Sequence, residues 1–520
     1  MKNTLSIYGS HDAGAVFINT SGELKILEYE RFVKKRYAMY SSKFDYRKSD
    51  IGTDQTSREK FIKYIKSQCN DNNIKTILYN GLNQLDLDYL KTQFLNAEFK
   101  LCGHHMAHAA SGYFTSKFNK AIIFSIDGGG IDHGVVGYTK VFSGDKFKIE
   151  LLNTPNICLG VPYGRIGCPI SEINPGPDSN KDSLVHAGKV MGLCAYGNIR
   201  HEWVSSLKKY YYHHDLNKLG KDINLNLSFN ALKGQESFDL AATSQYVFET
   251  LLLDIIIPYI DANDNFVLVG GCALNVLFNQ KLKEYLNDRN KHLYVPPNPN
   301  DCGLALGQFL IEHPEAKSNV YNGFDILDRD KFNEYIKNRS AQKVTIQNIV
   351  DLIKSGKILG LVSECSEVGP RALGNRSIIC DPSIVDMKDI LNAKVKFREW
   401  FRPFAPVCRL EDKDTFFDKA YETEFMSYAP NVKDEYKSKL KSISHADNTA
   451  RLQTVSEHQH ITFYKILTEL TNRNEIPVIL NTSFNIKGMP ILTTIEDALY
   501  CLDNTQMDYV IIEGWLFKRK

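Results

Sequence analysis

The chain has 520 residues, which is enough for two or more domains with separate hydrophobic cores. Its hydrophobic content of 43%, charged content of 24% and net charge of +2 are ordinary for a soluble globular protein, and they neither require nor exclude a nucleic-acid partner. The 11 cysteines include no CxxC pair, which excludes zinc-ribbon spacing and is typical of reduced thiols in a cytosolic protein.

The N-terminal segment lacks the apolar run of a signal peptide. No stretch approaches the roughly 18 apolar residues that a membrane helix needs. We therefore expect a cytoplasmic protein with no membrane partner.

The first half alternates segments that favour strands and helices. Leu5–Ile7 and Ala15–Ile18 predict a hairpin, and Leu24–Tyr29 predicts a third strand. Ala121–Ile126 and Phe266–Val269 predict buried strands followed by glycine turns, which commonly present backbone amides to a phosphate. This repeated strand–glycine pattern indicates the actin-like ATPase architecture, in which two related α/β halves enclose a nucleotide cleft.

A polar stretch from about Glu312 to Val344 predicts a connection between domains. Apolar residues then recur at helical spacing from Ile346 to Ile353, and Gly356 is expected to end that helix. Ile358–Val362 predicts a strand, so a second α/β domain begins here.

Two histidines and two aspartates form a candidate metal site. His104 and His108 lie four residues apart, so on a helix both project from one face. Asp127 ends a buried strand, and Asp301 precedes an apolar helix. This ligand set suits Fe, Mn or Zn. The alternative is a pair of structural histidines, and His105 leaves open which side chains face inward.

Eight motifs, in order along nearly the whole chain, make the sequence recognisable: HHMAHAASGYF, SIDGGG, GKVMGLCAYG, GGCALN, PPNPNDCGLALG, EVGPRALGNRSIICDP, KFREWFRPFAPV and NTSFNIKGMPI. In these motifs the chain resembles the NodU/CmcH-type O-carbamoyltransferase family, which includes the tobramycin O-carbamoyltransferase. The resemblance implies an actin-like ATPase-fold domain for metal-dependent carbamoyl transfer over residues 1–335. It implies a YrdC-like α/β domain that forms carbamoyl-adenylate over residues 340–520.

The resemblance also implies the chemistry. Carbamoyl phosphate and ATP with Mg²⁺ give carbamoyl-adenylate, and a hydroxyl acceptor then takes the carbamoyl group at a metal, expected to be Fe(II) or alternatively Mn or Zn. The family carries this metal on residues that match His104, His108, Asp127 and Asp301. A homodimer is a further possibility left open.

Basic and amide side chains in the last motifs are candidates for binding carbamoyl phosphate and ATP, because these polyanions need converging guanidinium and amide groups. The alternative is a set of surface ion pairs. The candidates are Arg371, Arg376, Lys396, Arg398, Arg402, Asn481, Ser483 and Lys487.

Candidates for holding the nucleotide or adenylate follow the two buried strands. Glycines allow close backbone approach, and an asparagine can bond a ribose, although a plain strand-to-helix turn has the same pattern. Lys189 can meet the phosphate or cap a helix. The set is Gly128, Gly129, Lys189, Gly270, Gly271 and Asn275.

His11 and Asp12 directly follow the first strand, on the side where an actin-like cleft opens. The ordinary pKa of histidine suits proton transfer at neutral pH, so we expect His11 to be the general base for the acceptor hydroxyl or its orienting group. Asp12 shares that role or holds the local turn.

The acceptor is the least determined part. Family members modify hydroxyls on antibiotics, sugars and other small metabolites, and a viral-type alternative is a hydroxymethylated pyrimidine in DNA. Arg31–Lys48 interleaves basic and aromatic residues, which can hold a phosphate backbone and stack bases, or can be an ordinary loop near the active site. Departures from the family pattern at Ile131, Arg36 and Lys487 leave acceptor specificity and the phosphate contacts open.

Three other functional classes fit the sequence less well. A tRNA threonylcarbamoyl transferase needs no GPRALGNRS half in the same chain. A hydrogenase-maturation carbamoyltransferase carries CxxC pairs that are absent here. An actin-like ATP-binding scaffold without transfer activity leaves the histidine–aspartate set and the second domain's arginines unexplained.

Overall fold

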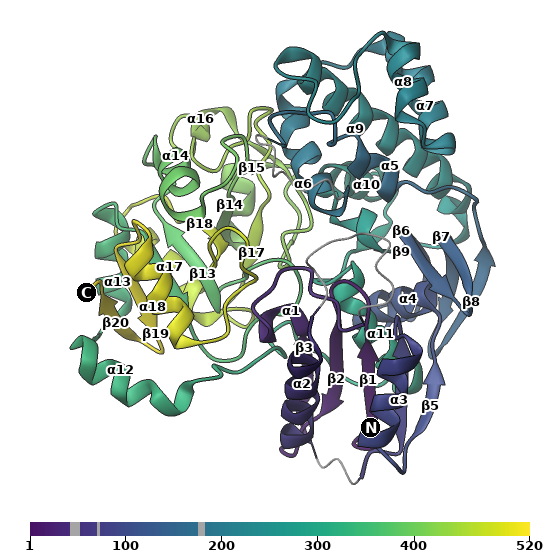
Figure 1. The fold of residues 1–520 in the computed structure, drawn as a ribbon. Coiled ribbons are helices and arrows are strands. Elements are labelled where there is room, and N and C mark those ends of the chain that lie inside the picture. The colour runs from purple at the N-terminus through teal and green to yellow at the C-terminus, as the bar shows by residue number, and fades with distance from the viewer. Residues whose placement is uncertain (42–52, 70–72, 175–182) are drawn as a thin grey trace.

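The N-terminal half contains two five-stranded sheets of the same topology (Figure 1). The computed structural model describes residues 1–41, 53–69, 73–174 and 183–520. The first sheet has the order β3-β2-β1-β4-β5, in which β1 pairs antiparallel with β2 and parallel with β4. Its strands are β1 Thr4–Tyr8, β2 Gly14–Ile18, β3 Leu24–Glu28, β4 Thr76–Asn80 and β5 Glu98–Leu101. The three predicted N-terminal strands are confirmed.

The second sheet repeats this order as β8-β7-β6-β9-β10. Here β6 pairs antiparallel with β7 and parallel with β9, as β1 does with β2 and β4. The strands are β6 Lys120–Asp132, β7 Val135–Asp145, β8 Lys148–Asn153, β9 Asn265–Val269 and β10 His292–Tyr294. The duplication is the actin-like arrangement, and it confirms the α/β fold class for this half.

Two helices pack between these sheets and against each other. Helix α4 (His104–Thr115) contacts β6 and β9, and helix α11 (Leu304–Glu312) contacts β1 and β2. Gly307 on α11 lies so close to the Ala107 carbonyl that a Cβ would be 1.8 Å from its oxygen. This close helix–helix contact brings the start of α4 next to the loop before α11.

The expected glycine turn after Ile126 is wrong in one respect. β6 continues through Gly128–Gly130 to Asp132, and the pairing with β7 shifts register between Ile126 and Gly130. Glycines make this irregular strand possible, since Gly129 has φ of +147°. The chain turns back only at His133 and Gly134.

Helices cover the remaining surfaces of the N-terminal half. They are α1 Tyr29–Phe32, α2 Gln55–Gln68, α3 Gln84–Gln93, α5 Gly160–Arg165, α6 Ser183–Leu193, α7 Val204–His213, α8 Leu216–Ile223, α9 Gln235–Ile256 and α10 Val276–Asn287. One apolar helical stretch, Gln235–Ala262, meets the length and composition of a membrane span, but 67% of its apolar window is buried inside the structure. It packs as a core helix with Phe248, Leu252 and their neighbours.

The C-terminal half is built on a mixed eight-stranded sheet with the order β11-β20-β19-β12-β13-β18-β14-β17. Alternate residues along each strand face two layers of helices, as in Ile378 and Ile379 of β13. Helices α13 Ile346–Lys354 and α17 Ile461–Asn472 pack on one face, and α18 Ile495–Asn504 packs on the other. This three-layer α/β arrangement fits the YrdC-like expectation.

The predicted helix before Gly356 and the predicted strand after it are both present, as α13 and β12. Gly356 has φ of +80°, the left-handed conformation that ends helices. The other strands are β11 Gln342–Lys343, β12 Leu359–Val362, β13 Arg376–Cys380, β14 Ala405–Arg409, β17 Gln453–Val455, β18 Val478–Ser483, β19 Tyr509–Ile512 and β20 Trp515–Lys518. Shorter elements are α12 Phe332–Arg339, α14 Met387–Ile390, α15 Lys413–Phe416, β15 Phe417–Asp418, β16 Asn431–Val432 and α16 Asp434–Lys437.

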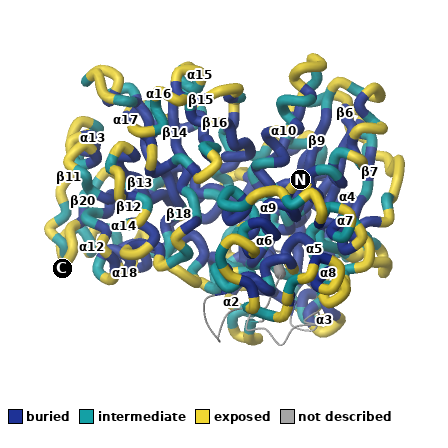
Figure 2. The backbone as a smooth tube through the Cα atoms, turned by 90° about the horizontal axis from the view of Figure 1, so that it is seen from above, coloured by how far each residue is buried: buried dark blue, intermediate teal, exposed yellow. Residues whose placement is uncertain are grey.

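The two halves pack together over a wide area. Phe332 and Ile336 of α12 pack on the C-terminal core, as does Ile326, whereas Phe324 packs in the core of the first sheet. Figure 2 shows buried backbone in the strands of both halves. The guanidinium of the fully buried Arg31 crosses the interface and donates to the carbonyls of Glu367 and Gly369 at 2.5 and 2.7 Å.

Candidate metal centre and anion-binding site

The four predicted metal ligands lie together in the buried space between the two N-terminal sheets. The Nε2 atoms of His104 and His108, one turn apart on α4, are 3.0 and 3.2 Å from the same oxygen of Asp127, its Oδ2. Oδ1 of Asp301 is 3.3 Å from Nε2 of His108 and 3.8 Å from that of His104. One ligand atom from each of the four residues lies within 4.8 Å of the others.

The backbone holds the Asp127 carboxylate in place. Its Oδ1 accepts hydrogen bonds from the N–H groups of Gly128 at 2.6 Å and Gly271 at 3.1 Å, which leaves Oδ2 facing the histidines. Burial would raise the pKa of Asp127, but the hydrogen bonds from His104 and His108 hold that pKa well below its usual value. Two glycine amides therefore orient a carboxylate that stays ionised, as outer-shell groups do around metal ligands.

The other ligands are also fixed by close neighbours. The hydroxyl of Tyr8 donates to Oδ2 of Asp301 at 2.6 Å. Gly130 lies against the His104 ring, where a Cβ would be 2.1 Å from the ring carbons. His105 faces away from the cluster, with Nδ1 2.8 Å from the Ser125 hydroxyl. The ambiguity about which histidines face inward is thereby settled.

Two imidazole nitrogens and two carboxylate oxygens, all buried and converging, fit a divalent transition metal. Burying these four residues together without a cation would cost free energy, because two carboxylates face each other across the cluster.

His11 extends this cluster toward solvent. Its Nε2 lies 3.4 Å from Oδ2 of Asp301, and its Nδ1 lies 3.1 Å from Oδ2 of Asp12. Burial would lower the pKa of His11, but the charge of Asp301 and the contact with Asp12 raise it to about 9. The His11 side chain is 25% exposed, against 2% for His104, so it is the member of this group that an entering substrate can reach.

The predicted nucleotide-binding residues divide into two groups. Gly128, Gly129, Gly270 and Gly271 all adjoin the Asp127 carboxylate or the bulged strand that carries it, and Gly270 has φ of +89°. Asn275 caps α10 by accepting from the Phe278 N–H at 3.0 Å, and it exchanges two amide hydrogen bonds with Gln245.

Arg371, Arg398 and Arg402 form the outward-facing part of the predicted anion site. All three are partly exposed, and burial is the largest cause of the lowered pKa of each. Neighbouring guanidinium groups add to the effect, since Arg402 lowers the pKa of both Arg371 and Arg398. Glu399, 3.6 Å from Arg402, is a single carboxylate beside these guanidinium groups, and cations in such excess are typical of a site for a polyanion.

Arg376, Lys396, Asn481 and Ser483 lie deeper and are already engaged by the protein. Arg376 is fully buried and donates to the carbonyls of Ser363, Asn375 and Glu364 at 2.6, 2.8 and 3.0 Å. Lys396 donates to the carbonyls of Ser483 and Asn485, both at 2.7 Å. Asn481 donates to the Ala372 carbonyl at 3.0 Å. In this structure these residues shape the loops around the arginines, while Lys487 is exposed.

Two further arginines join the group and were missed from the sequence. Burial and the charges of Arg371, Arg398 and Arg402 lower the pKa of Arg451 well below its usual range. Arg36, which comes from the N-terminal half, also lowers the pKa of those same three side chains. Arg451 stands outside the eight motifs, so its only signal is its position in the folded chain. Arg36 also stands outside them, but it belongs to the basic segment Arg31–Lys48.

Comparison with known proteins decides the family. Residues 53–310 match the family model described as Carbamoyltransferase N-terminus, and residues 350–519 match Carbamoyltransferase C-terminus. The uncharacterised protein MJ1058 of Methanocaldococcus jannaschii is 30% identical over 85% of this chain and 78% of its own length. The chain belongs to the carbamoyltransferase family.

Named relatives of this carbamoyltransferase act in nodulation. Nodulation protein NolO of Bradyrhizobium diazoefficiens is 30% identical over 80% of this chain and 79% of its own, and nodulation protein U of Sinorhizobium fredii is 28% identical over 80% and 77%. A crystal structure of full-length HypF in a phosphate- and nucleotide-bound form covers 59% of this chain and 55% of its own, with 14% identity and a TM-score of 0.37. That likeness is too distant to carry an argument.

The two sites of the carbamoyltransferase meet at the interface between its halves. Gly369, next to the Arg371 loop, packs on the N-terminal half, where a Cβ would lie 2.4 Å from the Pro297 carbonyl oxygen. Arg371 itself lines a small recess with Ala273 and Leu274, which follow the Gly270–Gly271 turn. Arg371 therefore lies beside the segment that follows the Gly270–Gly271 turn, whose Gly271 N–H binds the Asp127 carboxylate.

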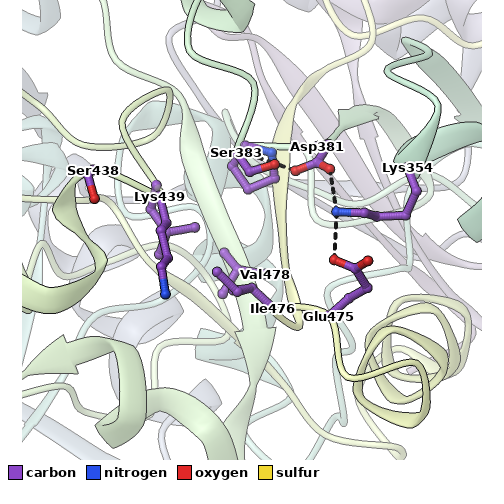
Figure 3. Close-up of a pocket in the computed structure, with 10 residues that line it drawn as sticks. Lys354, Asp381, Ser383, Ser438, Lys439, Glu475, Ile476 and Val478 are labelled. Atoms are coloured by element: carbon purple, nitrogen blue, oxygen red, sulfur yellow. Dashed lines mark hydrogen bonds and ion pairs between the residues drawn. The ribbon is translucent and has the colours of Figure 1, made fainter.

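A cavity of about 300 Å³ lies elsewhere in the C-terminal half (Figure 3). It opens beside Asp381 and Val478, whereas Arg376 and Ser483 stand at the opposite ends of the same two strands. Lys354 bridges Asp381 and Glu475 at 2.8 and 2.9 Å within it. The cavity's other lysine, Lys439, lies over the Tyr436 ring at 5.7 Å, so two lysines and no arginine line this cavity.

Proposed function

We propose that this carbamoyltransferase converts carbamoyl phosphate and ATP into carbamoyl-adenylate in its C-terminal half and transfers the carbamoyl group to an acceptor hydroxyl in its N-terminal half. The observation that carries the proposal is the pairing of two unlike sites across one interface. One is a cluster of guanidinium groups suited to phosphates, and the other is a buried histidine–aspartate set suited to a metal.

In the first step, Arg371, Arg398, Arg402 and Arg451 would hold the phosphates of ATP and carbamoyl phosphate, with Mg²⁺ accompanying ATP. Arg36 adds a cation from the N-terminal half, so the pocket is complete only when the two halves are closed on each other. Such closure excludes water, which protects an easily hydrolysed adenylate on its short path between the sites.

In the second step, the chain's own residues bind and orient the acceptor near His104, His108, Asp127 and Asp301. A metal held there, Fe(II) or alternatively Mn or Zn, would supply Lewis-acid polarisation. His11 lies beside Asp301 and is partly exposed, and its raised pKa of about 9 keeps it protonated at neutral pH. It would therefore orient the acceptor hydroxyl at neutral pH, and it would take the proton from that hydroxyl only above about pH 9. Asp12, 3.1 Å away, would hold the His11 ring.

We favour a small molecule or sugar as the acceptor over hydroxymethylated DNA. Part of the basic segment Arg31–Lys48 lies outside the described residues, from 42 onward. In the described part, Arg31 is buried in an ion pair with Glu28, and Lys34 pairs with Asp497 at 2.8 Å. These two cations are committed to the protein, and Arg36 of the same segment belongs to the arginine cluster, which leaves little of the segment for a DNA backbone.

The cellular site also belongs to the proposal. The 11 cysteines, all within the described residues, form no disulfide, which supports the expected cytoplasmic location.

The test separates the two steps. Pyrophosphate release from ATP should depend on carbamoyl phosphate, and Asp127→Asn should keep this release while losing transfer to acceptor. Arg402→Met should lose both. If folded Asp127→Asn stops pyrophosphate release as well, the two-site division is wrong.

A second experiment identifies the acceptor. The protein is incubated with a panel of sugars, small hydroxylated metabolites and hydroxymethylcytosine DNA, and mass spectrometry detects the product that has gained one carbamoyl group. If His11→Asn leaves the rate of carbamoyl transfer unchanged, His11 has no part in the mechanism.

A further inference from the structure

Strand β8 is an uncovered edge of the second sheet. It has six residues, Lys148–Asn153, and pairs only with β7 among the described strands. The other strands at the ends of the three large sheets are shorter, from five residues in β3 to two in β11. In Figure 1, β8 lies at the outer margin of the molecule, on the side away from the C-terminal half.

This edge exposes apolar side chains beside Lys148 and Glu150, which form an ion pair with each other. Phe147, at the tip of the β7–β8 hairpin, is 71% exposed, and Leu151 and Leu152 are 52% and 48% exposed. An exposed, apolar edge strand pairs readily with another strand, so proteins normally shorten, cover or charge such edges. An exposed edge of this kind therefore indicates a binding partner that pairs with β8.

The hairpin geometry shows which backbone groups are free. Asp145 and Lys148 flank a two-residue turn and pair directly with each other, so they form a hydrogen-bonded pair. Since hydrogen-bonded and non-hydrogen-bonded pairs alternate, Lys148 and Glu150 direct their N–H and C=O groups toward β7. Ile149 and Leu151 direct theirs outward, away from the sheet.

Charge selects one register for pairing this edge with itself. If two copies of β8 pair antiparallel around Ile149, Lys148 of each copy lies opposite Glu150 of the other, and Phe147 lies near Leu151. Registers centred on Lys148 or Glu150 are excluded because the backbone groups of those residues face β7, and a register centred on Leu151 would place Glu150 opposite Leu152, with no pair of opposite charges. The register centred on Ile149 also joins the outward-facing amides of Ile149 in both copies.

We propose that β8 is a homodimer interface, at which two copies of this chain join their second sheets through antiparallel β8–β8 pairing centred on Ile149. The occupant is a second copy because the strand is complementary to itself in hydrogen bonding, in apolar contact and in charge. The interface lies away from the metal cluster and the arginines, so each subunit keeps complete sites.

The decisive experiment exchanges the two charges. In Lys148→Glu, positions 148 and 150 of each β8 strand both carry a carboxylate. In Glu150→Lys, both positions carry an ammonium group. Each variant alone should weaken dimerisation by about tenfold or more, because two favourable cross-strand pairs become repulsive. Mixed in equal amounts, the two variants should restore a dimer with one copy of each, since every pair is then opposite in charge.

Sedimentation velocity over a dilution series measures the dimer fraction, and a tag on one variant detects the mixed dimer. Lys100→Glu, on the shorter edge strand β5, is the matched control and should leave dimerisation unchanged. A monomeric wild-type protein, a dimer insensitive to both single changes, or a mixture no more dimeric than its components would overturn the proposal. The mixing result is independent of catalysis, so it stands or fails separately from the proposed reaction.

Discussion

Nζ of Lys189 lies 2.7 Å from Oε1 of Glu399, and these two residues come from opposite halves of the protein. The other oxygen of Glu399 is 3.6 Å from Nη1 of Arg402. Burial would raise the pKa of Glu399, but the charge of Lys189 holds it below its usual value. One carboxylate therefore ties helix α6 of the N-terminal half to the arginine cluster of the C-terminal half.

Glu399→Gln should uncouple the two steps. Losing the ion pair removes about 1 kcal/mol of free energy that stabilises the aligned arrangement of the two halves. More adenylate should therefore escape before transfer. We expect carbamoylated product per pyrophosphate to fall by about fivefold, while pyrophosphate release itself changes less. Asp503→Asn breaks the Arg339–Asp503 pair inside the C-terminal half and is the control. An unchanged product-to-pyrophosphate ratio in Glu399→Gln would show that the pair has no alignment role.

Gly130→Ala should remove the metal without touching a ligand. A Cβ at this position would sit 2.1 Å from the His104 ring, so the ring must leave its place opposite Asp127. We expect metal content, measured by elemental analysis of the purified protein, to fall by about tenfold or more. Gly188→Ala adds a methyl group where no atom lies within 4 Å and should keep its metal. Full metal content in Gly130→Ala would mean that His104 does not hold the ion.

Arg451→Met should weaken binding of a phosphate substrate. Its guanidinium lies with Arg371, Arg398 and Arg402, and a charge-assisted hydrogen bond of this kind contributes about 1.5–3 kcal/mol. The KM for ATP or carbamoyl phosphate in pyrophosphate release should therefore rise by about 10- to 100-fold. Arg409→Met, which removes an arginine paired with Asp412 in the same half, should leave both KM values near wild type. Equal effects of the two changes would assign Arg451 a structural role.

The sequence predicted most of what depends on local pattern. The strands β1, β2, β3, β9 and β12 and the helix α13 follow from short apolar runs and turn residues, because burial of those runs fixes local geometry. The metal ligands were found because a four-residue spacing on one helix already sets two of them side by side.

The missed residues depend on contacts between distant segments. Arg451 stands in unremarkable local sequence and Arg36 in the basic segment Arg31–Lys48, and only the packing of the two halves brings them to the same site. Packing within the C-terminal half buries Arg376 against backbone carbonyls, although the more exposed Arg371 belongs to the same motif. The turn predicted at the glycine run after Ile126 was wrong for a similar reason, because pairing with β7 extends β6 through glycines that would otherwise favour a turn.

Glu424 should make the protein less stable as the pH rises. Burial, with a contribution from Glu422, raises its pKa from about 4.5 to about 7. The folded protein therefore keeps a proton that the unfolded chain releases between those values, so stability is complete below about pH 4.5 and falls as the pH rises through 7. Glu424→Gln should be more stable than wild type at pH 8, by about 1–3 kcal/mol, and equal to it at low pH.

Guanidinium unfolding midpoints at several pH values measure this difference. Glu435→Gln, a change at an exposed carboxylate on α16, should follow the wild-type pH dependence throughout. Glu424 accepts a hydrogen bond from Gln459 at 3.3 Å, and glutamine retains a carbonyl oxygen that can accept it, so the comparison isolates the charge. A Glu424→Gln protein that gains no stability between low pH and pH 8 would show that this carboxyl ionises with its ordinary pKa in the folded state.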